Sequence, residues 1–139
     1  MAGLPSLADI LEEYRFVEPE HRYRLLIDLG GSLEPMPDAL KTDATKVRGC
    51  SASVWVYPTI EEGRLHFLAD SDAAITKGIV ALVLTAVQDK PAAEVATLDI
   101  AECLAPFELG KHLSANRTQG IPNMIALIRE TAQRYADAA

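Results

Sequence analysis

The middle of the chain carries the pattern that decides its fold. Residues 53–88 read SVWVYPTIEEGRLHFLADSDAAITKGIVALVLTAVQ. Residues 53–57 and 64–68 are rich in β-branched and aromatic side chains, and Glu61-Glu62-Gly63 between them is typical of a turn. This pattern predicts an antiparallel β-hairpin.

A long helix is predicted directly after the hairpin. Asp70, Ser71 and Asp72 offer candidate caps, and residues 73–88 are apolar nearly all round. A helix of that kind is buried on every side, so we expect it at the centre of the molecule. Gly78 lies within it and costs about 1 kcal/mol against alanine unless another backbone approaches closely there.

Helices are also predicted on both sides of this segment. Ser6 can cap a helix whose apolar residues recur every three or four positions, and a second helix begins at Pro19 and ends at Gly30. Apolar residues at helical spacing mark a last helix over 121–135. We therefore expect a single domain over residues 1–139 with an α+β fold, in which helices cover a small antiparallel β-sheet.

Charge and hydropathy narrow the functional classes. The formal net charge of the 139 residues is -7, which disfavours binding to nucleic acid or to anionic membranes. The N-terminus has no basic, apolar signal sequence, and the apolar run 79–87 is too short to span a bilayer. These features predict a cytoplasmic protein, in a reducing compartment where cysteines stay free.

Metal sites and common catalytic motifs are not indicated. His21, His66 and His112 are isolated, and there is no Cys-x-x-Cys, no phosphate-binding glycine loop and no Gly-x-Ser-x-Gly. We expect each histidine to be a surface residue or a side chain with its hydrogen bonds satisfied. No metal and no cofactor are predicted.

The two cysteines differ in their surroundings. Cys103 lies in an apolar, helix-like segment, where a free cysteine acts as a small hydrophobic residue. Cys50 follows Gly49 among small residues, which leaves room for another molecule to approach. Lys46 and Arg48 add positive charge, which favours the reactive thiolate. The local sequence fits a reactive cysteine at position 50 and a packed loop cysteine equally well.

A polar segment precedes the last helix. Residues 112–120 are expected to form a long loop with one cation, Arg117. The arginine either lies in water or pairs with a carboxylate, or it provides an anion-binding spot near the start of the helix. An anion-binding spot would stabilise a thiolate or a persulfide.

Three blocks of sequence stand out together: VRGCSASVW at 47–55, DSDAAITKG at 70–78 and HLSANRTQG at 112–120. In this order and spacing they resemble the SufE family, sulfur-acceptor proteins that partner cysteine desulfurases in iron–sulfur cluster assembly. The similarity extends over almost the whole chain. One departure is Ala52, where many members carry a hydroxyl residue.

The resemblance implies a role for residues in each block. Cys50 would accept the terminal sulfur of a persulfide on a SufS- or CsdA-like desulfurase, stimulate that enzyme, and pass the sulfur to a cluster scaffold. Arg117 would support the Cys50 loop or the partner contact. Asp72 would cap the long helix or touch the desulfurase, and His112 would have a supporting or partner-binding role.

Three alternatives remain open from the sequence. The implied fold is shared with IscU-type cluster scaffolds, but a scaffold needs several thiolate ligands and Cys103 matches none of their positions. A cysteine-nucleophile hydrolase would need His112 within reach of Cys50 as its base. A binding module could stimulate the desulfurase by contact alone, with Cys50 incidental.

Overall fold

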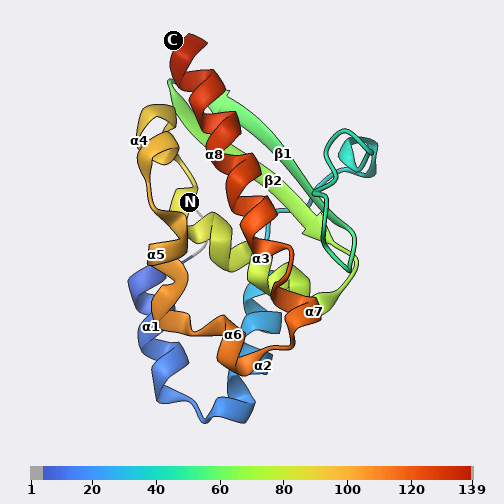
Figure 1. Cartoon of the computed structure of the whole chain (residues 1–139), viewed down its shortest axis with the longest axis vertical. Coiled ribbons are helices and arrows are strands. Elements are labelled where there is room, and N and C mark those ends of the chain that lie inside the picture. Colours follow the sequence, from blue (N-terminus) through green and yellow to red (C-terminus); the bar gives the residue numbers. More distant parts are fainter. Residues whose placement is uncertain (1–4, 139) are drawn as a thin grey trace.

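A three-stranded antiparallel sheet and a set of helices make up the molecule (Figure 1). The computed structural model describes residues 5–138. The strand order is β1-β2-β3. The elements are α1 (Leu7–Phe16), α2 (Pro19–Gly30), η1 (Asp38–Leu40), β1 (Val54–Glu61), β2 (Arg64–Ser71), α3 (Ala74–Val87), β3 (Lys90–Pro91), α4 (Ala92–Thr97), α5 (Ile100–Leu104), η2 (Ala105–Phe107), α6 (Leu109–His112), α7 (Ala115–Thr118) and α8 (Ile121–Ala138).

The predicted hairpin is confirmed, and its strands are longer than the sequence pattern indicated. β1 and β2 pair along their whole length, from Val54 opposite Ser71 to Glu61 opposite Arg64. Glu62 and Gly63 both have positive φ, at 54° and 79°, which is the backbone that a two-residue hairpin turn of type I′ needs. The two-residue strand β3 extends the sheet beside β2.

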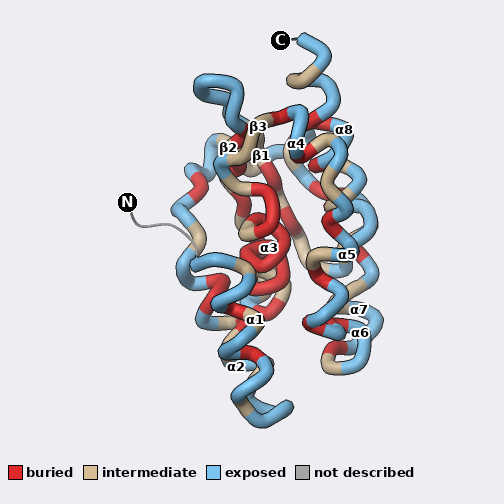
Figure 2. Tube along the Cα trace, turned by 90° about the vertical axis from the view of Figure 1, so that its left-hand side faces the viewer, coloured by how far each residue is buried: buried red, intermediate tan, exposed pale blue. Residues whose placement is uncertain are grey.

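Helix α3 lies at the centre, as expected from its apolar sequence. Figure 2 shows it as a nearly continuous buried run between the other elements. Gly78 allows α2 to cross it closely, because a Cβ at this position would lie 2.1 Å from the carbonyl oxygen of Leu26. This is the close backbone approach that a glycine in the middle of a helix requires.

The outer helices complete an α+β fold, which confirms the predicted class. The Ser6 hydroxyl caps α1 by accepting a hydrogen bond from the Asp9 N–H at 3.1 Å. The long helix α8 buries Met124 and Ile128, and α4 packs against it (Figure 1). In the part of the chain that the structure describes, no helix is both long and apolar enough to cross a membrane.

Two local predictions are wrong. Residues 112–120 are not one long loop, because they contain the end of α6, the short helix α7 and the approach to α8. Asp72 does not cap α3. The N-cap residue is Ala73, without a side-chain cap, because the Asp72 carboxylate accepts a hydrogen bond from the Ser53 N–H instead.

Candidate functional site

Cys50 lies in a short loop that leads into β1. A backbone hydrogen bond of 2.8 Å from the Val47 N–H to the Val54 carbonyl closes the base of this loop. Gly49 has φ of +84°, so the chain turns sharply just before the cysteine, in a conformation that favours glycine. The sequence therefore sets Cys50 near the tip of a tight turn.

Three side-chain hydrogen bonds fasten the Cys50 loop to α7, to α8 and to the connection between β2 and α3. Ser51 donates a hydrogen bond to the Asn116 carbonyl in α7 at 2.6 Å. From α8, Asn123 donates its amide hydrogen to the Arg48 carbonyl at 2.9 Å. Asp72, just before α3, accepts from the backbone of Ser53 at 3.0 Å. The loop is thus held in place by partners distant in sequence.

The Cys50 side chain packs against Gly120, the residue directly before α8. A Cβ built on Gly120 would lie 2.2 Å from the Cys50 Sγ and 3.1 Å from its Cβ. The thiol therefore occupies the space that any other side chain at position 120 would fill.

A small cavity of about 10 Å³ adjoins the thiol. That is roughly the volume needed to admit one water-sized sphere. Its other lining residues come from the Cys50 loop, α3, α7 and the start of α8: Ser51, Ala52, Thr76, Ile79, Asn116, Arg117, Gly120, Ile121 and Met124. The cysteine is half-buried in this setting of mixed polar and apolar residues.

Burial raises the pKa of the Cys50 thiol. The expectation that Lys46 and Arg48 favour the thiolate is therefore not met in this structure. Both side chains are exposed, and among the described residues no cation lowers the pKa of the thiol against the effect of burial. With the loop in this position, burial therefore favours the protonated thiol over the nucleophilic thiolate.

An open groove of about 550 Å³ lies beside the cavity and shares part of its lining, including Ser51, Ala52 and Arg117. On its rim, Arg117 from α7 meets Tyr23 from α2. The guanidinium carbon is 5.1 Å from the centroid of the Tyr23 ring, and the guanidinium donates a hydrogen bond to the tyrosine hydroxyl. The groove thus connects the Cys50 loop with the molecular surface.

His112 does not line the Cys50 cavity. Its Nε2 accepts a hydrogen bond of 2.9 Å from the Arg22 guanidinium, which can only donate. Its ring also lies edge-on to Tyr14, with the ring centroids 6.0 Å apart. These contacts join α6 to α1 and α2, so they give His112 a structural task. They do not give it the position of a base beside Cys50.

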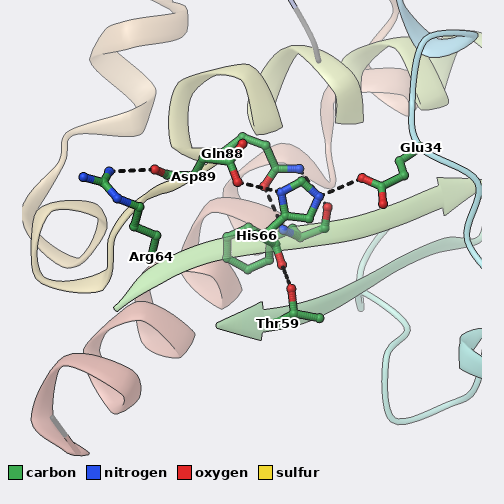
Figure 3. Close-up of polar contacts among 7 residues, drawn as sticks. Glu34, Thr59, Arg64, His66, Gln88 and Asp89 are labelled. Carbon is green, nitrogen blue, oxygen red and sulfur yellow. Dashed lines mark hydrogen bonds and ion pairs between the residues drawn. The ribbon is translucent and has the colours of Figure 1, made fainter. Parts of the chain in front are cut away.

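Both ring nitrogens of His66 have hydrogen-bond partners, in a different part of the molecule from Cys50 (Figure 3). Its Nε2 lies 2.7 Å from a carboxylate oxygen of Glu34, and its Nδ1 lies 2.8 Å from one of Asp89. Burial alone would lower the pKa of His66, but the hydrogen bonds to the two carboxylates outweigh it and raise the pKa.

Cys103 lies on α5, half-buried and packed against the hydrophobic core. This position agrees with the structural role predicted for it. Within residues 5–138, no three histidine, cysteine, aspartate or glutamate side chains are grouped closely enough to hold a metal ion.

Sequence reasoning missed three residues around Cys50. Gly120, directly before α8, and Asn123, within α8, both contact the loop. Tyr23 in α2 contacts Arg117 and holds its side chain. A glycine before a helix is typical of a turn or a cap, and Tyr23 falls on the apolar face of its helix, so neither pattern points to a site. Tyr23 is 40% exposed, which is more than a core position allows.

Comparison with known proteins identifies the family. A family model described as SufE, Fe-S metabolism associated domain, matches residues 8–132. The chain belongs to the SufE family. An uncharacterised SufE-like protein of Rhizobium etli is 36% identical over 97% of this chain and 95% of its own length. The resemblance inferred from the three sequence blocks is therefore confirmed, and with it an association with iron–sulfur metabolism.

A solved structure shares the fold of this SufE-family chain. The solution structure of a hypothetical protein from Thermus thermophilus superimposes with a TM-score of 0.76, over 94% of this chain and 96% of that one. The two sequences are 15% identical, so the match concerns the fold alone.

Proposed function

We propose that Cys50 accepts sulfur from a persulfide on a cysteine desulfurase and delivers it for iron–sulfur cluster assembly. The observation that carries the proposal is the placement of this cysteine in a SufE-family chain. It lies at the tip of a loop held by α7, by α8 and by Asp72 between β2 and α3, with its thiol beside an open groove.

The proposed step is a thiol exchange. The Cys50 thiolate attacks the terminal sulfur of the donor persulfide, a new sulfur–sulfur bond forms at Cys50, and the donor sulfur–sulfur bond breaks. The donor cysteine leaves as a thiolate and takes up the proton that Cys50 lost. The exchange has no net oxidation or reduction, so it consumes no further reagent.

The half-buried position of the thiol has a consequence for this step. Because burial raises the pKa of Cys50, a movement of the loop toward solvent would favour the thiolate. Binding of the desulfurase over the groove is the event that we expect to release the loop. Afterwards, the cavity of about 10 Å³ offers space for roughly one added atom, which would shield a new persulfide from solvent.

The supporting residues have defined tasks under this proposal. Asp72 holds the loop through the Ser53 backbone, and Arg117 places a positive charge on the rim of the groove. His112 acts at a distance, through the contact between α6 and the first two helices. The hydrolase alternative loses support, since His112 does not line the Cys50 cavity.

Mass spectrometry tests the proposal directly. After incubation with a cysteine desulfurase and cysteine, the intact mass should rise by one sulfur atom, and peptide mapping should place it on Cys50. A mild thiol reductant should remove the gain, because it reduces a persulfide and leaves a sulfinate of nearly equal mass untouched. Cys103→Ala is the matched control and should still gain sulfur.

The same assay separates transfer from stimulation by contact. Cys50→Ser should lose both the mass gain and the stimulation of desulfurase turnover, while binding to the desulfurase persists. Full stimulation by Cys50→Ser would show that the protein acts by contact, and sulfur on Cys103 would show that the wrong thiol was chosen.

A further inference from the structure

The contact between Tyr23 and Arg117 joins two helices that are far apart in sequence. Tyr23 lies on α2 and Arg117 on α7, and both line the groove beside the Cys50 loop. The tyrosine holds the guanidinium in two ways, with its ring 5.1 Å from the guanidinium carbon and with its hydroxyl as a hydrogen-bond acceptor. Two such contacts restrict where the charge can lie.

Arg117 contacts a tyrosine, which is neutral, so this contact does not compensate its positive charge. The chain contains 20 acidic residues, yet within residues 5–138 no carboxylate forms an ion pair with Arg117. A tyrosine orients a guanidinium without neutralising it, whereas a carboxylate would cancel its charge. The positive charge therefore remains available to an anion in the groove.

Helix α7 also contacts the Cys50 loop directly. The carbonyl of Asn116, the residue before Arg117, accepts the hydrogen bond from Ser51, the residue after Cys50. Arg117 itself lines both the groove and the Cys50 cavity. An anion bound by the guanidinium would lie at the entrance to the cysteine.

We propose that Tyr23 is a positioning residue that holds Arg117 as an uncompensated cation, so that the groove directs anionic sulfur compounds to Cys50 in preference to neutral ones. In the transfer reaction, one negative charge is spread over the attacking, transferred and leaving sulfurs. A fixed cation beside them stabilises this charge. The inference rests on the proposed function for its natural reagent, but its test does not depend on a desulfurase.

The test compares two alkylating reagents of similar size and different charge. Second-order rate constants for Cys50 are measured with the anion iodoacetate and with neutral iodoacetamide, in a Cys103→Ala background. Arg117→Ala should lower the ratio of the two rate constants by about threefold or more, as expected for loss of a unit charge several ångströms away. Tyr23→Leu keeps the charge but frees the guanidinium to leave the groove, so it should lower the ratio in the same direction by a smaller factor. Tyr23→Phe keeps the ring and should give an intermediate ratio.

The ratio separates positioning from a structural effect. Looser packing of the loop would change both rates by the same factor and leave the ratio constant, and that outcome would overturn the proposal. A lower ratio in Arg117→Ala with a wild-type ratio in Tyr23→Leu would show that the tyrosine does not position the charge. Tyr57→Leu, which removes a half-buried tyrosine of β1 outside the groove, is the control and should leave the ratio unchanged.

Two precautions keep the result clear. Circular dichroism and thermal melting establish that each variant is folded, and the nearly isosteric Tyr23→Phe serves if Tyr23→Leu is unstable. An unchanged ratio in both Tyr23→Phe and Arg117→Gln would also overturn the proposal.

If the charge preference is found but Cys50 accepts no sulfur from a desulfurase, the proposed function fails and this inference stands.

Discussion

Replacing Gly120 by alanine should drive the Cys50 thiol out of its cavity. The new Cβ would lie 2.2 Å from the sulfur, 3.1 Å from the Cβ and 3.2 Å from the Cα of Cys50. To reach an ordinary contact distance, the sulfur must move by about 1.5 Å. The backbone of Gly120 has no positive φ, so the alanine itself is not strained and the Cys50 loop is the part that yields.

The expected change is larger in reactivity than in stability. A glycine-to-alanine change at a compatible position stabilises by about 0.4–1 kcal/mol, and lost packing of the half-buried thiol costs a similar amount. If this packing favours the buried position of Cys50 by about 0.5–1 kcal/mol, removing that preference accelerates its reaction about 2- to 5-fold at neutral pH. The raised pKa of Cys50 should also fall toward its ordinary value.

The assay is the rate of Cys50 alkylation by iodoacetamide as a function of pH, in a Cys103→Ala background. In the wild type the rate should rise with pH and reach half its maximum above the ordinary pKa of a cysteine, because only the thiolate reacts. Gly120→Ala should move this midpoint to lower pH. An unchanged rate and midpoint in a folded Gly120→Ala protein would refute the reasoning.

Gly110→Ala is the matched control for this substitution. A Cβ at Gly110 meets no atom within 4 Å, and its backbone also lacks a positive φ. The variant should therefore keep the wild-type alkylation rate and midpoint. An equal acceleration in both alanine variants would mean that the effect does not come from the contact with Cys50.

Three further predictions concern the rest of the molecule. Gly78→Ala should lower the free energy of unfolding by about 1–3 kcal/mol in urea titrations, since its Cβ would overlap the α2 backbone, and full stability would contradict that close approach. The raised pKa of His66 means that its interaction with two carboxylates stabilises the fold fully below about pH 6.5 and loses this effect as pH rises through the folded-state pKa. The stability difference between wild type and His66→Gln in thermal melts should therefore shrink with increasing pH, and a constant difference would disprove the assignment. Cys103→Ala should cost about 1–2 kcal/mol with sulfur acceptance intact, and a folded variant that accepts no sulfur would reveal a working thiol on α5.

The elements of the fold could be predicted because their signals are local. The Ser6 cap, the turn at Glu62-Gly63 and the apolar run of α3 each act within a few residues, and the structure agrees with all three. The family could also be predicted, because three short blocks occur in the right order. The two-residue strand β3 was missed, since a pairing that short leaves no periodic pattern.

The sequence by itself singled out Cys50, from its glycine, its small neighbours and its motif. It could not determine the state of the thiol. The nearby Lys46 and Arg48 favoured a thiolate, but burial raises the pKa, and burial is a property of packing.

Tertiary structure alone decided which residues surround the thiol. Gly120 lies 70 positions after Cys50, and 94 positions separate Tyr23 from Arg117. Contacts across such separations depend on how α2, α7 and α8 are placed around the Cys50 loop, which no local periodicity specifies. The residues that confine Cys50 and orient the charge beside it therefore appear only once the chain is folded.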